Sequence, residues 1–149
     1  MADELDTGRL VGRPFDYYAA TPAFITQYNK SFPPGALVFN GSCRSLFGTV
    51  LADAYRSAGA AAYLGYSEVV TVGYHNLAVN TFFGLLLAGR DVARALGDTL
   101  LQHGVKDPAG GFYGCEPAAF IGAGNQDLKI TPEGFNNGSF EQGAGGLPQ

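Results

Sequence analysis

Apolar residues in this chain alternate between short continuous runs and longer stretches with helical spacing. Two short runs, residues 36–39 and 60–65, are bounded by prolines, glycines or small polar residues. Such runs are typical of buried parallel strands. Helical spacing follows each run, over residues 46–57 and 75–88. The alternation predicts an α/β fold in which helices cover a parallel sheet.

Capping residues predict two further helices. Thr21 followed by Pro22 is typical of a helix N-terminus, and this helix should end before the Pro-Pro pair that precedes the first strand. Asp91 is placed to cap a helix over residues 92–103, and Gly104 is placed to end it. Helices therefore flank the predicted strands on both sides along the chain.

Apolar residues at the two ends of the chain have no regular spacing. Residues 1–20 predict an irregular lead-in. Residues 105–149, which hold many of the 22 glycines, predict a loop-rich tail that packs less well than residues 21–104, apart from one edge strand within residues 120–130. Two parallel strands cannot form a stable doubly wound domain alone, because both faces and both edges of a sheet need neighbours. We therefore expect residues 21–104 to be part of a larger domain.

Charge and composition exclude several classes of function. The net charge of −4, without a basic cluster, argues against a nucleic-acid binder. Two cysteines make neither a disulfide framework nor a zinc site, and we expect no metal and no cofactor. The longest apolar stretch, residues 77–88, is too short to span a bilayer, and the acidic N-terminus has no apolar signal-peptide region. We expect no membrane association.

Cys43 is the candidate for chemistry. It follows the first predicted strand directly, and a helical pattern begins almost at once at Leu46. Open α/β sheets bind ligands at this edge, where a helix N-terminus stabilises a thiolate. Cys43 is therefore a candidate nucleophile, with an inert packing cysteine as the alternative. Cys115 lies among glycines and is expected to be a bystander.

Residues 21–104 resemble the C-terminal half of caspase-like cysteine peptidases, a group that includes gingipains, clostripain, caspases and CHAT domains. The resemblance rests on LVFNGSCRS at residues 37–45, SAGAAAYLG at 57–65, LAGR at 87–90 and VARAL at 92–96. It implies an incomplete caspase-like fold with three α/β/α layers, and it puts Cys43 at the position of the nucleophile.

The same resemblance implies a substrate pocket beside the second strand, with a peptide or protein as substrate or partner. Tyr66 and Glu68, both in the loop after that strand, are then candidate substrate-binding residues. A carboxylate at Glu68 is placed to receive a basic side chain of the substrate. Arg44 is placed to steady the thiolate, with a plain surface role as the alternative.

The chain departs from the family at the general base. The resemblance implies a histidine, usually followed by glycine, upstream of Thr21, whereas the first histidine is His75. A thiolate without a base to protonate the leaving amine is a poor peptidase. We therefore expect the fragment to be inactive alone, and a cysteine endopeptidase when an upstream histidine completes it. The sheet edge left bare would be covered by the lead-in, by the C-terminal strand, or by a second copy in a homo-oligomer.

Residues 137–143 resemble the first strand of β-sandwich modules that follow catalytic domains in secreted bacterial proteins, which would make the parent protein secreted. Two other functions stay open. One is a non-catalytic caspase-like scaffold that binds partners. The other is an α/β-hydrolase with residues 41–45 as a cysteine elbow, in which His75 or His103 would have to serve as the base.

Overall fold

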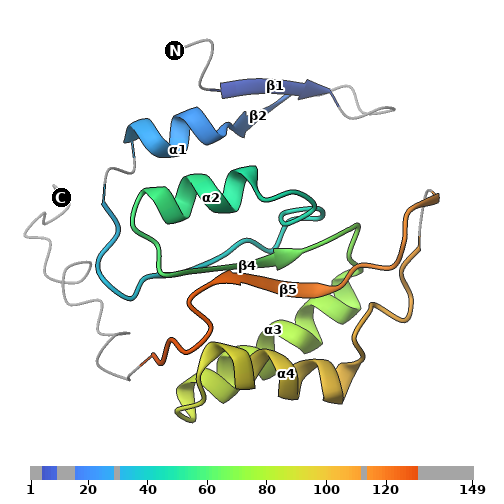
Figure 1. The fold of residues 1–149 in the computed structure, drawn as a ribbon. Helices are drawn as coiled ribbons and strands as arrows, with labels where there is room; N and C mark the ends of the chain where they lie inside the picture. Colours follow the sequence, from blue (N-terminus) through green and yellow to red (C-terminus); the bar gives the residue numbers. More distant parts are fainter. Residues whose placement is uncertain (1–4, 10–15, 29–30, 112–113, 131–149) are drawn as a thin grey trace, which may run out of the picture.

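A mixed three-stranded sheet with helices on both faces forms the centre of the structure (Figure 1). The computed structural model describes residues 5–9, 16–28, 31–111 and 114–130. The observed class is α/β, as the alternation of short runs and helical stretches predicts. In the described residues, no helix is both long and apolar enough to cross a membrane.

The sheet has the order β3 (Leu37–Phe39), β4 (Ala62–Tyr66), β5 (Phe120–Gly124). β3 and β4 are parallel, with Phe39 opposite Leu64. β4 and β5 are antiparallel, with Tyr66 opposite Phe120. The expectation of a wholly parallel sheet was therefore wrong for its last strand, although residues 120–124 do form the edge strand predicted there.

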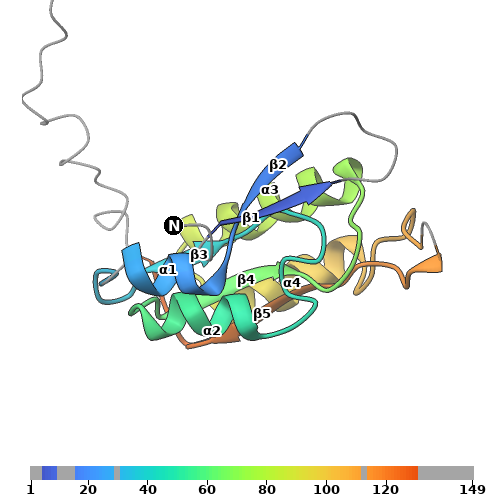
Figure 2. The same ribbon diagram turned by 90° about the horizontal axis from the view of Figure 1, so that it is seen from above.

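The direction of β5 follows from the helices that precede it. α3 (Val72–Leu87) leads away from the carboxyl end of β4, and α4 (Val92–His103) packs beside it and leads back. The chain therefore starts β5 near the end of β4 and must run antiparallel to it. α3 and α4 lie on one face of the sheet, and α2 (Val50–Ser57) and α1 (Pro22–Tyr28) lie on the other (Figures 1 and 2).

α2 begins later than the sequence predicts. Residues 42–47 form turns, and the helix starts at Val50 instead of Leu46. The backbone N–H of Leu46 donates to the Tyr66 carbonyl 2.9 Å away, so it is committed to the end of β4. Val50, which the helical pattern points inward, has 67% of its surface exposed.

The caps of α3 and α4 come from side chains that satisfy N–H groups of the first turn. The Asp91 carboxylate accepts from the Arg94 N–H at 2.8 Å, and α4 has the bounds that the sequence predicts. The Thr71 hydroxyl accepts from the Tyr74 N–H at 3.3 Å, so α3 begins three residues before the predicted start at His75. Beneath both helices lies the larger core, which includes Leu64, Tyr66, Tyr74, Ala78, Phe82, Leu86, Val92, Ala95 and Phe120.

The N-terminal segment contains a hairpin where the sequence predicts an irregular lead-in. β1 (Leu5–Arg9) pairs antiparallel with β2 (Asp16–Ala20). This pairing joins two segments that lack an alternating apolar pattern, which is why the sequence gives no sign of it. Because β1 and β2 pair with each other and β5 pairs with β4, one edge of β3 stays without a hydrogen-bonded neighbour among the described residues.

Residues after Gly104 contribute more to the core than expected. Asp107 and Ala118 are buried, with 1% and 0% of their surfaces exposed, as is Phe120 at the start of β5. The expectation of poor packing was wrong for Asp107 and Ala118, whereas Phe120 belongs to the edge strand that was expected to pack. Residues 131–149, which include the segment that resembles a β-sandwich strand, lie outside the described residues.

Candidate functional site

The loop that carries Cys43 is fixed to β4 by Ser45. The Ser45 hydroxyl donates to the Asn40 carbonyl at 2.8 Å and accepts from the Tyr66 N–H at 2.9 Å. The Ser45 carbonyl accepts a third bond, of 3.1 Å, from the buried Tyr63 hydroxyl. These bonds hold both ends of the turn that follows β3, so the position of Cys43 is set by the sheet.

Two glycines allow this loop to lie so close to the sheet and to α3. A Cβ on Gly65 would lie 2.5 Å from the Ser45 hydroxyl oxygen, which is closer than atoms can approach. A Cβ on Gly41 would lie 2.6 Å from Cε1 of His75. Both positions therefore need a residue without a side chain.

Cys43 lies in the turns after β3, at the carboxyl end of the parallel pair. Its side chain is exposed, and Sγ lies 3.8 Å from the Val70 carbonyl oxygen. The expected helix N-terminus is not beside it, because α2 starts only at Val50. The helix dipole therefore does not act on this thiol in the way the sequence suggests, and its candidacy rests on exposure and on its place at the strand end.

Arg44 is the centre of the charged contacts at the site. Its Nε lies 2.8 Å from Oε2 of Glu68, and its backbone N–H donates to the Glu68 carbonyl at 3.0 Å. Its Nη2 lies 3.1 Å from Sγ of Cys115, and the guanidinium stacks 5.0 Å from the ring centre of Phe47. Arg44 has a φ of 58°, a left-handed conformation that these contacts hold in place.

These contacts change the roles that the sequence predicts. The hydrogen bond to Glu68, followed by the electrostatic interaction with Cys115, raises the pKa of the Arg44 guanidinium. Glu68, the candidate acceptor for a basic substrate side chain, is already paired with a basic side chain of its own chain. The guanidinium of Arg44 contacts the sulfur of Cys115, whereas the sequence placed this arginine beside the Cys43 thiolate.

Cys115 was missed as a member of the site. It reaches Arg44 because β5 runs antiparallel to β4, so the residues before Phe120 return to the end of β4. The return is visible in the bond from the Ser67 N–H to the Ala119 carbonyl, at 3.0 Å. A sequence signal existed, since two helices between β4 and β5 imply this return.

Tyr66 and His75 lie beneath the loop. Tyr66, a candidate substrate-binding residue, is fully buried, and its hydroxyl has no hydrogen-bond partner in the described structure. Burial, followed by the charges of Tyr74 and Asp107, raises the pKa of Tyr66. The His75 ring packs 5.6 Å from the Tyr66 ring and 5.9 Å from that of Phe39, and its buried Nδ1 likewise has no partner in the described residues. Because the whole residue is buried and its backbone N–H and carbonyl bond to Ser45 and Leu46, Tyr66 has no surface that a substrate can contact in this structure.

Asp107 is a second residue that sequence reasoning missed. It is buried, and its carboxylate accepts from the Thr71 N–H at 2.7 Å and from the Ala109 N–H at 3.0 Å. The first bond fixes the chain next to Val70, whose carbonyl contacts Cys43. Asp107 therefore positions one wall of the candidate site from the tail of the chain.

His103 lies away from this site. Its Nε2 is 2.7 Å from the Thr81 hydroxyl, in the contact between α3 and α4. This contact gives His103 a structural role between the two helices. It also places His103 away from Cys43, so His103 cannot be the base that the α/β-hydrolase alternative needs. Among the described residues, no group of three metal-binding side chains is close enough to hold an ion.

Comparisons with protein-family models, curated proteins and solved structures found no match for this chain.

Proposed function

We propose that this chain is the cysteine-bearing half of a caspase-like peptidase domain, with Cys43 at the nucleophile position and the histidine base supplied by a segment that is not part of this sequence. The observation that carries the proposal is the exposed thiol of Cys43 in the turn after β3, where β3 is parallel to β4. The carboxyl edge of a parallel pair is where α/β proteins bind and transform their ligands.

The free edge of β3 supports the proposal. In the family that the sequence resembles, the strand with the base precedes the cysteine strand. A strand placed along the free edge of β3 would end beside Cys43 and would complete the pairing that the described residues leave open. Its occupant is the missing strand or a second copy of the chain.

The Arg44–Glu68 pair supports a pocket for a basic side chain. The Arg44 guanidinium pairs with the Glu68 carboxylate, with 2.8 Å between Nε and Oε2. A basic side chain of a substrate would pair with this carboxylate in the same way. The Arg44 side chain is half exposed, and solvent screens ion pairs of this kind. A substrate lysine or arginine can therefore compete with Arg44 for the Glu68 carboxylate.

The chemistry of the chain alone follows from the missing base. The Cys43 thiolate attacks an acyl carbon, the S–C bond forms, and the leaving group departs with the electron pair of the broken bond. An amide must receive a proton on nitrogen to leave, and no base holds that proton here. A p-nitrophenyl ester releases a stable phenolate without protonation, so it acylates Cys43 where an amide does not.

The test is a comparison of an N-acyl-arginine p-nitrophenyl ester with the corresponding p-nitroanilide. We expect a burst of one equivalent of p-nitrophenolate and an acyl group on Cys43 by intact-mass and peptide mapping, with no hydrolysis of the anilide. Cys115→Ser should keep the burst, and Cys43→Ser should remove it. Acylation of Cys43 no faster than that of a free cysteine peptide would contradict the proposal.

A non-catalytic interaction domain is the second candidate. Two observations favour it. The Glu68 carboxylate is already paired with Arg44, and the edge of β3 that has no neighbour among the described residues is a template for pairing with a strand of another chain. The same experiment separates the two functions, because a domain that only binds partners has no reason to react faster than a free cysteine.

A further inference from the structure

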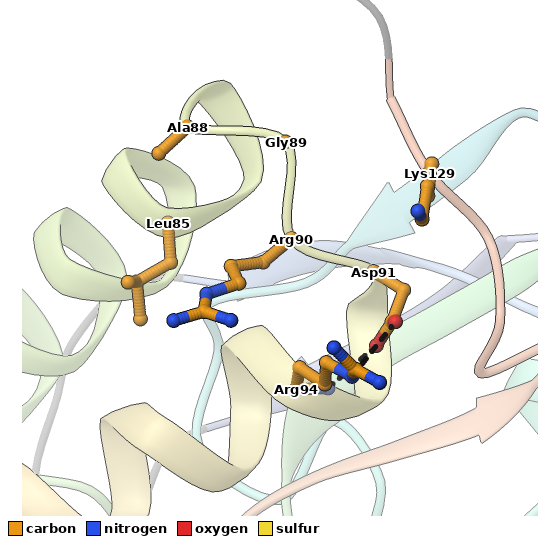
Figure 3. A pocket seen from close by; sticks show the side chains of 7 residues that line it. All are labelled: Leu85, Ala88, Gly89, Arg90, Asp91, Arg94 and Lys129. Atoms are coloured by element: carbon orange, nitrogen blue, oxygen red, sulfur yellow. Dashed lines mark hydrogen bonds and ion pairs between the residues drawn. The ribbon is translucent and has the colours of Figure 1, made fainter.

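A cavity of about 390 Å³ lies at the turn between α3 and α4, and Figure 3 shows the seven residues that line it. It is at the far end of α3 from the Cys43 loop, a distance of about 24 Å for a helix of this length. Three lining residues are cations (Arg90, Arg94 and Lys129) and one is a carboxylate, Asp91. Its charge is thus opposite to that of the chain, whose net charge is −4.

The walls of the cavity are fixed by backbone bonds between the start of α4 and the segment after β5. The Val92 N–H donates to the Leu128 carbonyl at 2.9 Å, and the Ala93 N–H donates to the Gln126 carbonyl at 2.8 Å. Asp91 and Lys129 form an antiparallel bridge. Lys129 is thereby held beside Asp91, although the two are distant in sequence, while the Arg90 side chain points toward Leu85 and the Arg94 guanidinium lies against Asp91 (Figure 3).

These bonds also decide what can bind a ligand here. The N–H groups of Val92, Ala93 and Arg94 already have partners, so the helix N-terminus has no free donor among them. Binding must come from the cationic side chains. Their existing ion pairs are long, at 3.7 Å from Arg90 to Asp98 and 3.4 Å from Arg94 to Asp91. Both guanidinium groups are themselves half or more exposed, so both can turn to a stronger partner.

The third cation is uncommitted within the described structure. Lys129 forms no ion pair with a described residue, and it lines the cavity together with Arg90 and Arg94, so three flexible cationic side chains can turn toward the several oxygens of one phosphate. Leu85 and Ala88 provide an apolar wall next to these charges. The volume lies within the range of small-molecule sites.

We infer that this cavity is a binding site for a small organic phosphate, with the phosphate held by Arg90, Arg94 and Lys129 and the organic part against Leu85 and Ala88. The site does not depend on Cys43 or on the proposed peptidase function. It adds a ligand site to the opposite end of the helical layer.

The test is a titration of the ¹⁵N-labelled chain with phenyl phosphate, inorganic phosphate and benzoate, followed by amide shifts and by calorimetry. We expect saturable binding of phenyl phosphate below about 10 mM, and about fivefold weaker binding of inorganic phosphate, which cannot contact the apolar wall. Benzoate, with fewer oxygens and one charge, should bind more weakly than phenyl phosphate. The shifted amides should lie at residues 89–94 and 126–130.

Three variants make the test specific. Lys129→Gln and Arg90→Gln should each weaken phenyl phosphate binding about tenfold, the value for one charged hydrogen bond. Arg56→Gln, an equal charge change on α2, and Cys43→Ser should leave binding unchanged. Absence of saturable binding, an equal loss in Arg56→Gln, or equal affinity for benzoate and phenyl phosphate would each overturn the inference.

Discussion

The contact between Ser45 and Gly65 allows a quantitative test of how the Cys43 loop is held. Ser45→Ala removes the bonds to the Asn40 carbonyl and from the Tyr66 N–H. The Tyr66 N–H, in a fully buried strand residue, then lacks a partner, which costs about 1–3 kcal/mol. We expect a loss of about 2 kcal/mol in the free energy of unfolding, which corresponds to a fall in Tm of roughly 4–8 °C for a chain of this size.

Gly65→Ala probes the same contact from the other side. Its new Cβ would meet the Ser45 hydroxyl oxygen at 2.5 Å, whereas the next atoms, Cβ of Ser45 and Cβ of Leu46, are 3.2 and 3.3 Å away. Overpacking of this kind costs about 1–3 kcal/mol. In the Ser45→Ala background the closest atom is gone, so Gly65→Ala should cost less there, by at least about 0.5 kcal/mol.

The assay is urea unfolding of the two single variants, the double variant and Ser57→Ala, followed by circular dichroism. Ser57 is exposed at the end of α2, and its variant should stay within about 0.5 kcal/mol of the parent chain. Strictly additive costs for Ser45 and Gly65, or a loss below 0.5 kcal/mol for Ser45→Ala, would refute the view that this contact fixes the loop.

Three further predictions concern the core, the pH dependence and the ion pair. Phe82→Ala should lower the free energy of unfolding by about 3–5 kcal/mol, whereas Leu101→Ala, at an 87% exposed position, should be near neutral by urea unfolding. Burial raises the pKa of Tyr66 above its ordinary 10.0, so the fold favours the neutral phenol. The stability this gives is complete below pH 10 and is lost as pH rises through the folded pKa, so tyrosinate absorbance should rise together with alkaline unfolding. Arg44→Ala should change stability by less than about 1 kcal/mol and leave Glu68 open, which faster acylation of Cys43 by an arginine ester would reveal.

Local signals in the sequence predicted the elements whose ends carry their own caps. Asp91 and Gly104 set both bounds of α4, and Thr21 accepts from the Phe24 N–H at 3.2 Å at the predicted start of α1. β3 and β4 were visible as short apolar runs, and their parallel pairing follows from the single helix between them.

Tertiary contacts decided the features that the sequence did not predict. Leu46 continues the helical period of α2, but its N–H bonds to Tyr66 and the helix starts four residues later. Cys115 has no local pattern, and only the antiparallel return of β5 brings its sulfur to Arg44. Glu68 stays a predicted substrate-binding residue, and its pairing with Arg44, in which Arg44 takes a left-handed backbone conformation, has no local sequence pattern.

The central claim, that Cys43 is a nucleophile served by a pocket for a basic side chain, is tested most directly with a peptidyl chloromethyl ketone. Such a reagent forms an S–C bond and releases chloride, so it needs no proton donor for the leaving group. The measurement is the rate at which each cysteine of the full chain is alkylated, by peptide mapping, with arginine or norleucine next to the ketone. We predict that Cys43 is alkylated faster than Cys115 and that arginine is preferred at Cys43. Equal rates at the two cysteines, without an effect of the peptide, would contradict the claim.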